Sequence, residues 1–406
     1  MLLELARASL WSRRGTAALC VLSLAISVFV LLGVEFIRQE ARESFGRTLS
    51  GTDLIVGARG GQLNLLLYSV FRIGEPTNNI RWVSYRAIAA DPAVAWTVPL
   101  SLGDSHRGFR VLGTTAAYFE HYRYGGDRSL ALRAGSRELG VRNAVIGANV
   151  ADRLGYRSGR EIVLAHGTGG VGFRRHEDHP FTVAGILART GTPVDDTVHV
   201  SLEAIDAIHA GFDTAPAGRA ASERTITAFL VGLESRMLAF RLQRQINEYA
   251  EEPLQAILPG VALSRLWRVL GSVEKVLRVI SALVLVSALL GMSTMLLASL
   301  RERRGELAVL RTIGATPVFI FLLLEAEALL LCALGLGGGM ALVSVASLVS
   351  RDWLRDAHGL LISVYVPGAT ALQLSAAVLA LALLCALAPA LGAYRSSLGS
   401  ALSGRR

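Results

Sequence analysis

The chain has 406 residues, of which 52% are hydrophobic, and its formal net charge is +9. Its mean hydropathy of +0.46 excludes an ordinary soluble protein, because the apolar residues are concentrated in a few long runs. The positive charge alone would suit a nucleic-acid partner. The arginines gather beside the apolar runs, however, which indicates a membrane protein with basic cytoplasmic segments. We therefore expect no nucleic acid among its partners.

Four apolar runs are each longer than the roughly 20 residues that a helix needs to cross a bilayer. They cover residues 16–37, 276–300, 317–350 and 369–393. Arginines lie before the first run, between the second and third, and after the fourth, so the positive-inside rule places both termini in the cytoplasm. The rule assigns three segments to that side: an amphipathic N-terminal segment, a central segment and a tail, at residues 1–15, 301–316 and 394–406. No small-residue cleavage site follows the first run, so we interpret it as an uncleaved anchor.

The segment between the first two spans, residues 38–275, has the composition of a globular domain. Short β-rich runs such as 180–187 alternate with runs of helical periodicity such as 148–156. This mixture predicts a large α+β domain with a small sheet, inserted between transmembrane helices 1 and 2 of an α-helical membrane protein. A short loop at 351–368 is the other external segment.

The inserted segment is long enough for two subdomains, with divisions expected near residues 135 and 215, where glycine, alanine and serine are frequent. At both of its ends the helical pattern continues from the span with polar residues replacing apolar ones, and no flexible linker intervenes. This pattern predicts helical stalks that would couple the domain to the spans. Ordinary overhang of the membrane helices explains the pattern equally well.

The central cytoplasmic segment, RERRGELAVLRTIGAT, places a short charged helix between the second and third spans. Gly314 suits the end of that helix, Thr316 suits the cap of the next one, and Pro317 suits its first turn. A basic helix at this place could simply contact lipid headgroups. A lipid anchor has no need of acidic residues, however, so Glu302 and Glu306 favour docking into a groove of another protein.

This segment, followed by FLLLEAEALLL and a glycine cluster, resembles the coupling helix of the FtsX/MacB-type (mechanotransmission, type VII) family of ABC transporter permeases. VIGANVADRLGYRSGREIVLAHG, residues 145–167, resembles the porter subdomain of that family, and the layout of spans is similar over the whole chain. The resemblance implies a bacterial inner-membrane permease whose large domain is periplasmic. It also implies that an ATP-binding subunit contacts Glu302, Arg303, Arg304, Glu306, Leu310, Arg311, Gly314 and Ala315.

The lysine content bears independently on where ATP would bind. A P-loop needs a lysine directly after a glycine-rich loop, and the only lysine, Lys275, has no such loop before it. We therefore expect a non-catalytic membrane subunit that binds no cofactor itself, with ATP and Mg²⁺ held by a separate ABC ATP-binding subunit and no fused ATPase domain. The other expected partners are a second copy in a homodimer or a paralogue in a heterodimer, a periplasmic accessory protein or lipoprotein, and membrane lipid.

Two features of the third span invite interpretation. Gly335 and Gly339 have the G-xxx-G spacing that permits close helix packing within or between protomers. Glu325 and Glu327 are costly in a membrane unless paired or neutral. They would form a proton or cation site, or else lie near the cytoplasmic interface or pair with an arginine of a neighbouring subunit. We favour the second interpretation, because the family has a glutamate here without transport through the bundle.

The function predicted from these features is transmission of ATP-driven motion to the periplasmic domain for export or extraction of a substrate. One alternative is an FtsX-like signal transducer that controls a periplasmic partner. Another is a membrane-anchored metal-binding protein, because His176, Asp178 and His179 in HGTGGVGFRRHEDHP could supply zinc ligands. Their spacing matches no established zinc motif, and a glycine-rich charged loop more often forms a solvated hairpin.

Overall fold

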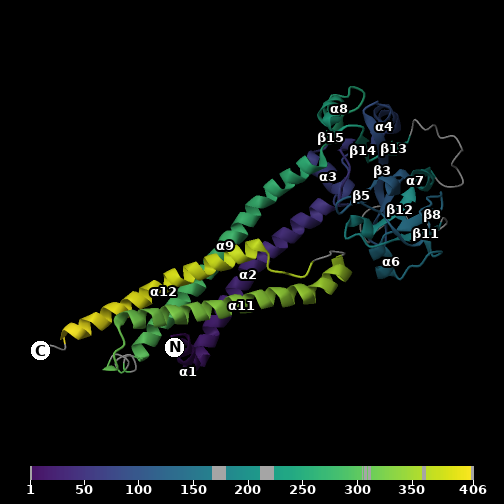
Figure 1. The fold of residues 1–406 in the computed structure, drawn as a ribbon. Helices are drawn as coiled ribbons and strands as arrows, with labels where there is room; N and C mark the ends of the chain where they lie inside the picture. Colours follow the sequence, from purple (N-terminus) through teal and green to yellow (C-terminus); the bar gives the residue numbers. More distant parts are fainter. Residues whose placement is uncertain are drawn as a thin grey trace. The chain divides into compact units, whose positions relative to one another are not determined.

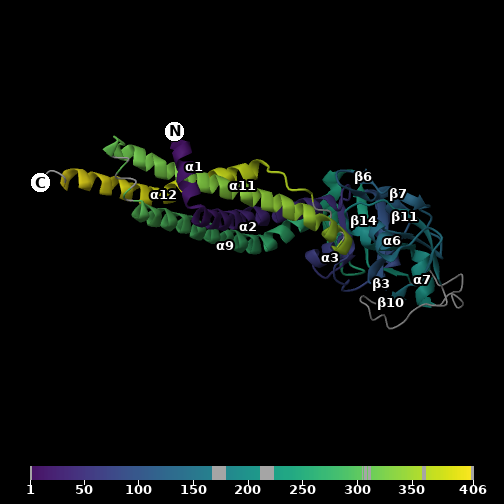
Figure 2. The ribbon, with the colours of Figure 1, turned by 90° about the horizontal axis from the view of Figure 1, so that it is seen from below.

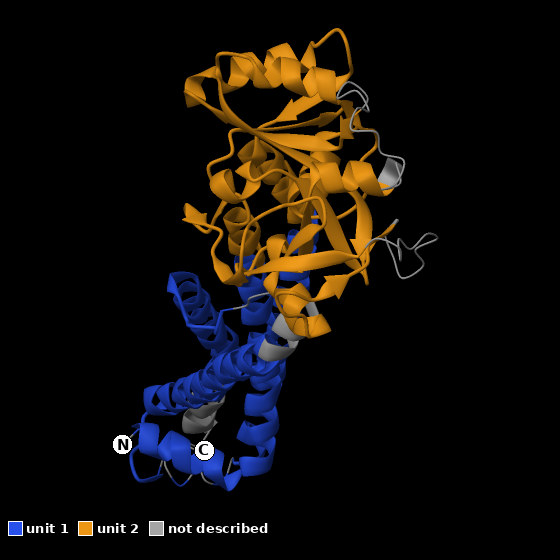
Figure 3. Cartoon of the chain, turned by 90° about the vertical axis from the view of Figure 1, so that its right-hand side faces the viewer, with its two compact units in different colours: residues 1–40, 272–352, 362–406 blue, residues 41–271, 353–361 orange. Residues whose placement is uncertain are grey.

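A computed structural model describes residues 2–166, 180–210, 224–303, 305, 309, 312–358 and 363–403. The chain forms two compact units (Figure 3). We call residues 1–40, 272–352 and 362–406 the membrane unit, and residues 41–271 with 353–361 the inserted domain.

The membrane unit is built from four long helices and a short N-terminal one (Figure 1). They are α1 (Leu2–Ser12), α2 (Arg14–Arg47), α9 (Pro259–Glu302), α11 (Pro317–His358) and α12 (Ala369–Ser403). Among the described residues, α2, α9, α11 and α12 are the helices long and apolar enough to cross a membrane. The helices α2 and α9 are longer than the apolar runs that they contain, since α2 continues to Arg47 and α9 already begins at Pro259.

The four long helices pack through one apolar core, and Figure 2 shows them running alongside one another. Its buried members include Leu24 and Val28 of α2, Leu289 and Met292 of α9, Leu331 and Leu336 of α11, and Ala382 and Ala386 of α12. Many other large apolar side chains of these helices are exposed, among them Leu283, Leu334 and Leu384. An apolar outer face suits helices surrounded by lipid, because lipid tails are as apolar as the side chains.

The inserted domain is organised around an 11-stranded sheet whose central strand is β3 (Val94–His106). The first half of β3 pairs with β14 (Ala228–Leu233), and its second half pairs with β4 (Phe109–Thr114). Beyond β14 follow β1 (Leu54–Ala58) and β15 (Leu254–Ile257). Beyond β4 follow β12 (Thr197–Ser201), β8 (Asn143–Ile146), β11 (Phe181–Leu187) and β7 (Leu132–Gly135).

Shorter elements complete the domain. The strands β9 (Glu161–Ile162) and β10 (Ala165–His166) pair with β11 and β3. Two further ladders join β2 (Ile80–Arg81) to β13 (Thr225–Ile226) and β5 (Arg123–Tyr124) to β6 (Arg128–Ser129). The helices are α3 (Gln62–Val70), α4 (Trp82–Ala89), α5 (Ala117–His121), α6 (Ala148–Leu154), α7 (Leu202–Ala210) and α8 (Ala239–Asn247), with 3₁₀ turns at Pro193–Asp196 and Arg236–Leu238.

The α+β class of the inserted domain is confirmed, but the expectation of a small sheet is wrong. A single long strand, β3, takes part in the pairing on both sides, so the strands join into one sheet and the domain forms one compact unit. The strand was hard to recognise because it contains Pro99 and Gly103, two residue types that normally interrupt a strand. Residue 215, one of the two expected division points, lies outside the described residues.

Candidate functional site

The segment between the second and third spans begins where α9 ends, at Glu302. Residues 301 and 302 therefore belong to the long helix, and the backbone N–H of Arg303 still bonds to the Ser299 carbonyl at 3.1 Å. At the other end of the segment, Gly314 has a φ of +105°, a conformation that favours glycine. The Thr316 hydroxyl accepts a bond from the Phe319 N–H at 3.3 Å, and α11 begins at Pro317. The predicted stop at Gly314 and cap at Thr316 are thus confirmed.

The residues predicted to contact an ATP-binding subunit are described only in part. Arg304, Glu306, Leu310 and Arg311 lie outside the described residues. Glu302 and Gly314 are exposed and Ala315 is half-buried. Arg303 differs from these, because its side chain is only 17% exposed and turns toward α11.

The partner of Arg303 is Glu327, a carboxylate in the third turn of α11 with an exposed fraction of 0%. The Nη1 atom of Arg303 lies 3.1 Å from Oε1 of Glu327. A second guanidinium, that of Arg13, lies 3.5 Å from Oε2 of the same carboxylate. The two basic side chains therefore approach the two oxygens of one buried acid.

The hydroxyl of Ser9 lies at the centre of this cluster. It donates a hydrogen bond to Glu327 and accepts bonds from Arg303 at 2.5 Å and from Arg13 at 3.2 Å. We call Ser9, Arg13, Arg303 and Glu327 the Glu327 cluster. Its members come from α1, the α1–α2 junction, the end of α9, and α11, so it joins four parts of the membrane unit at one point.

The charges in the cluster explain why an acid is tolerated in a span. An isolated carboxylate in an apolar interior costs several kcal/mol, whereas two guanidiniums and a hydroxyl supply both opposite charge and hydrogen bonds. The sequence interpretation places both acids near the cytoplasmic interface or pairs them with an arginine of a neighbouring subunit; the two arginines that contact Glu327 belong to its own chain. Sequence alone does not identify these partners, because Arg13 and Arg303 are distant from Glu327 along the chain and have the positions of topological charges.

The neighbouring acid, Glu325, behaves differently. It is only partly buried, and its Oε1 atom has no hydrogen-bond partner among the described residues. The two glutamates of the third span are thus not equivalent, and only Glu327 lies in the cluster.

Gly335 and Gly339 of the third span lie against α2. A Cβ atom added at Gly335 would lie 2.6 Å from Cβ of Leu24, and one added at Gly339 would lie 2.6 Å from Cγ1 of Val28. Both distances are shorter than side chains tolerate, so the absence of a side chain allows the two helices of one chain to approach.

The proposed zinc ligands His176, Asp178 and His179 lie outside the described residues. Within the described ranges, no group of three histidine, cysteine or acidic side chains is arranged to hold a metal ion.

Comparison with known proteins gives two matches to family models, in chain order. Residues 17–249 match the model described as MacB-like periplasmic core domain, and residues 278–398 match the FtsX-like permease C-terminal model. No curated protein sequence gave a significant match.

Solved structures resemble the chain in part. One is the periplasmic region of MacB from Actinobacillus actinomycetemcomitans, with 9% identity, a TM-score of 0.36, and coverage of 54% of this chain and 94% of that one. Another is the extracellular domain of the noncanonic ABC-type transporter YknZ from Gram-positive bacteria, with 12% identity, a TM-score of 0.31, and coverage of 50% and 98%.

The periplasmic core model alone spans more than half of the chain, and the permease model covers the three spans that follow. Four apolar helices with a large α+β domain between the first and second are the architecture expected of such a protein. The chain therefore belongs to the MacB/FtsX-type family of ABC transporter permeases, membrane subunits that carry a periplasmic domain and work with an ABC ATPase.

Proposed function

We propose that this permease receives the motion of a separate ATP-binding subunit at residues 301–316 and transmits it to the periplasmic domain, for export or extraction of a substrate. In this proposal the protein lies in the bacterial inner membrane with both termini in the cytoplasm, and two copies form the working assembly. ATP and Mg²⁺ are held by the partner, and the chain itself binds no cofactor.

The observation that carries the proposal is the contact between Arg303 and Glu327. Within the segment that would receive the partner's motion, Arg303 is the first residue after the end of α9, and Glu327 belongs to the next span. A displacement of the segment would therefore act on α11 through a buried ion pair, and on α1 through Ser9. Arg303 therefore connects the start of the segment to the bundle.

The distribution of buried charge favours mechanical transmission over a polar channel. Among the described residues of the membrane unit, the buried acidic or basic side chains are Glu40 and Glu327. Glu40 lies near the end of the first span, where it accepts a hydrogen bond from the Ser363 hydroxyl at 2.5 Å. Glu327 contacts Arg13 at the other end of that span. The buried polar residues between these two points include Ser27, Ser281 and Ser293, whose hydroxyls donate to backbone carbonyls. A hydrophilic pathway for a charged substrate would need ionisable side chains there.

The helix α9 offers a route for the motion. It is one helix of 44 residues, and it begins at Pro259 of the inserted domain and ends directly before Arg303. Every interior residue of an α-helix is bonded to the turn before it, so a displacement of one end is expected to be carried along the helix.

The test is co-purification of the tagged protein from its native membrane, with identification of partners by mass spectrometry and measurement of ATPase activity. We expect a stoichiometric P-loop ATPase with the wild type, and its loss or uncoupling in the double variant Glu306→Lys/Arg311→Glu. Arg7→Glu is the matched control, because Arg7 is exposed on α1 and lies outside the receiving segment. Absence of an ATPase after gentle solubilisation, or an equal loss in the Arg7 variant, would contradict the proposal.

A further inference from the structure

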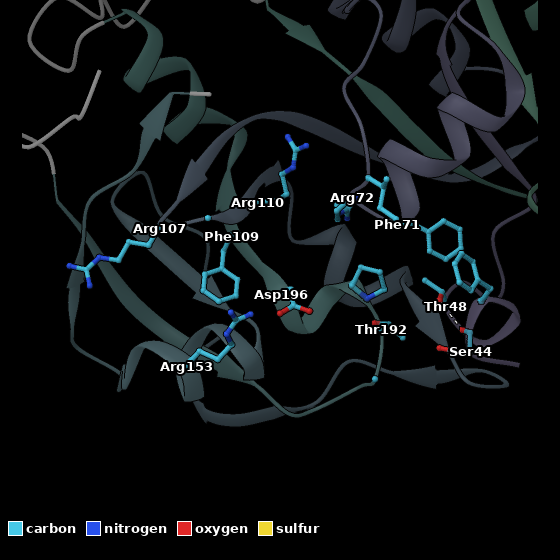
Figure 4. Close-up of a pocket in the computed structure, with 15 residues that line it drawn as sticks. Ser44, Thr48, Phe71, Arg72, Arg107, Phe109, Arg110, Arg153, Thr192 and Asp196 are labelled. Carbon is cyan, nitrogen blue, oxygen red and sulfur yellow. Dashed lines mark hydrogen bonds between the residues drawn. The ribbon is translucent and has the colours of Figure 1, made fainter. Parts of the chain in front are cut away.

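A cavity of about 490 Å³ opens in the inserted domain (Figure 4), and every residue that lines it belongs to that domain. Sites for small molecules typically have volumes of about 300–1,000 Å³. Its walls come from the last turn of α2, the turn after α3, the β3–β4 hairpin, the end of α6, and residues 191–196. The proposed transmission of motion does not involve this cavity.

The charged groups of the lining are mostly basic. Arg72, Arg107, Arg110 and Arg153 line the cavity, and Asp196 is the one acidic residue among the lining residues. Arg110 is neutralised by Glu75 at 3.0 Å, and Arg107 points away from the other labelled side chains (Figure 4). The positive charge inside the cavity therefore comes from Arg72 and Arg153.

Arg153 is exposed at the mouth of the cavity, and its guanidinium has no acceptor among the described residues. The guanidinium lies 5.2 Å from the centre of the Phe109 ring. A guanidinium carries five N–H donors in a planar fork that matches phosphate and carboxylate groups. The acid nearest to it in Figure 4, Asp196, attracts it electrostatically but accepts its hydrogen bond from the side-chain amide of Asn149, at 3.1 Å.

Arg72 is held at the cavity by an unusual backbone. Its φ of +60° is left-handed, a conformation that costs a side-chain-bearing residue roughly 1 kcal/mol or more. The guanidinium donates to the Ser69 carbonyl and to the Tyr118 hydroxyl, while the buried Nε has no partner among the described residues. Backbone strain of this kind is retained where the surrounding structure fixes it, and it often marks a functional position.

The walls of the cavity are fixed by local hydrogen bonds. The carboxylate of Asp195 accepts from the backbone N–H groups of Thr190 at 2.8 Å and Gly191 at 2.7 Å, which closes the loop before the 3₁₀ turn. On the opposite wall, Arg107 and Gly108 both have positive φ, as a two-residue hairpin requires. A site whose walls are already ordered loses little entropy when a ligand binds.

The apolar part of the lining is mostly aromatic, with Phe45, Phe71 and Phe109 beside Ile73 and Pro193. Phe45 and Phe71 pack against each other with ring centres 4.6 Å apart. The ring of Phe109 lies under the guanidinium of Arg153. We propose that the cavity is a binding site for a small organic anion, whose phosphate or carboxylate group contacts Arg72 and Arg153 and whose apolar body packs on Phe45, Phe71 and Phe109. The inference concerns binding alone and holds whether the permease moves cargo or transmits a signal.

The test is calorimetric titration of the full-length protein in nanodiscs of neutral lipid. The probe is 1-naphthyl phosphate, which joins an anionic group to an aromatic body. Inorganic phosphate and the uncharged 1-naphthalenemethanol represent the two halves. We expect one molecule of naphthyl phosphate to bind per chain, at least about tenfold more tightly than either half, because each half uses only one part of the lining.

Three variants decide whether the probe occupies this cavity. Arg153→Gln removes a charge that contacts the anion and should weaken binding about tenfold. Asp196→Asn removes the opposing carboxylate and should tighten binding about threefold, a gain that misfolding cannot produce. Arg157→Gln is the matched control: Arg157 is exposed, does not line the cavity, and should leave the affinity unchanged.

Failure of the wild type to bind naphthyl phosphate would overturn the proposal. Equal affinities of the wild type, the Arg153 variant and the Asp196 variant would also overturn it, because the probe would then bind elsewhere. Neither result depends on an ATP-binding subunit, so the outcome is independent of the co-purification test above.

Discussion

The guanidinium of Arg303 lies 3.1 Å from the carboxylate of Glu327, and the hydroxyl of Ser9 contacts both side chains. The contact connects the end of α9 to the third turn of α11, so it bridges the two spans that flank residues 303–316. Basic residues beside a span normally mark its cytoplasmic end and nothing more. Here two of them, Arg13 and Arg303, neutralise a buried acid.

We expect Glu327→Ala to destabilise the membrane unit by about 3–5 kcal/mol, because it leaves two partly buried guanidiniums facing each other without a counter-charge. The measurement is the thermal unfolding of the purified protein in a fixed detergent, followed together with its yield in the membrane. Glu325→Ala is the matched control. It removes an acid two residues away that is only partly buried and lacks a described partner for Oε1. Equal effects of the two substitutions would show that the cluster contributes nothing specific.

The substitution Arg303→Gln distinguishes docking of the ATP-binding subunit from transmission of its motion to the bundle. The side chain of Arg303 contacts the bundle, so its substitution should leave co-purification of the ATP-binding subunit intact while changing the ATPase rate of the assembly. Glu306→Lys/Arg311→Glu should instead reduce co-purification. The two measurements are the ratio of subunits recovered and the ATPase rate per recovered complex. Loss of the ATPase in the Arg303 variant would assign Arg303 to the docking surface and contradict its role in transmission.

Two glycines of α11, Gly335 and Gly337, have different space around them and can be compared within one helix. A methyl group at Gly335 would lie 2.6 Å from Leu24 of α2, whereas one at Gly337 would meet nothing within 4 Å. We expect Gly335→Ala to destabilise the protein by about 1–3 kcal/mol, as overpacking does. Gly337→Ala should cause no loss, because alanine favours a helix more than glycine does. Thermal unfolding of both variants in the same detergent measures the difference, and a loss in the Gly337 variant as large as that at Gly335 would contradict this packing.

Sequence patterns predict the elements of this fold better than their connections. The four apolar runs correspond to α2, α9, α11 and α12, because length and hydropathy suffice to define a span. The cap at Thr316 and the stop at Gly314 followed from residue chemistry alone. The continuous sheet did not, because the pairing of β3 with both β14 and β4 depends on long-range contacts that leave no periodic signal.

In the candidate site, too, the sequence predicts local features but not long-range contacts. The sequence singles out Glu327, because an acid in a span is rare, but it does not identify the partners of that acid. Ser9 lies 318 residues away in sequence, and nothing in its local pattern distinguishes it from other serines. The basic lining of the cavity leaves no local signal either, because Arg72 and Arg153 line one cavity only after the chain has folded.

One buried histidine in the core of the inserted domain makes stability depend on pH. His199 of β12 is fully buried, and its Nδ1 atom donates to the Val145 carbonyl at 3.1 Å. Its Nε2 atom has no partner among the described residues, and the rings of Tyr118 and Phe119 lie beside it. Burial, together with the charge of Arg72, lowers the pKa of His199 to about 3.

Because the pKa of His199 is lowered on folding, the unfolded chain binds a proton between about pH 6.5 and pH 3 while the folded domain does not. The contribution of His199 to stability is therefore fully present above pH 6.5 and falls by about 1.4 kcal/mol per unit as the pH drops through this window. His199→Gln removes that dependence. Hydrogen exchange at the amides of β12, measured on the full chain, gives the opening free energy of both proteins at each pH. We expect the wild type minus variant difference to fall by about 2.5 kcal/mol from pH 7.5 to pH 4.5, and a difference independent of pH would show that His199 is already protonated in the folded domain or exposed.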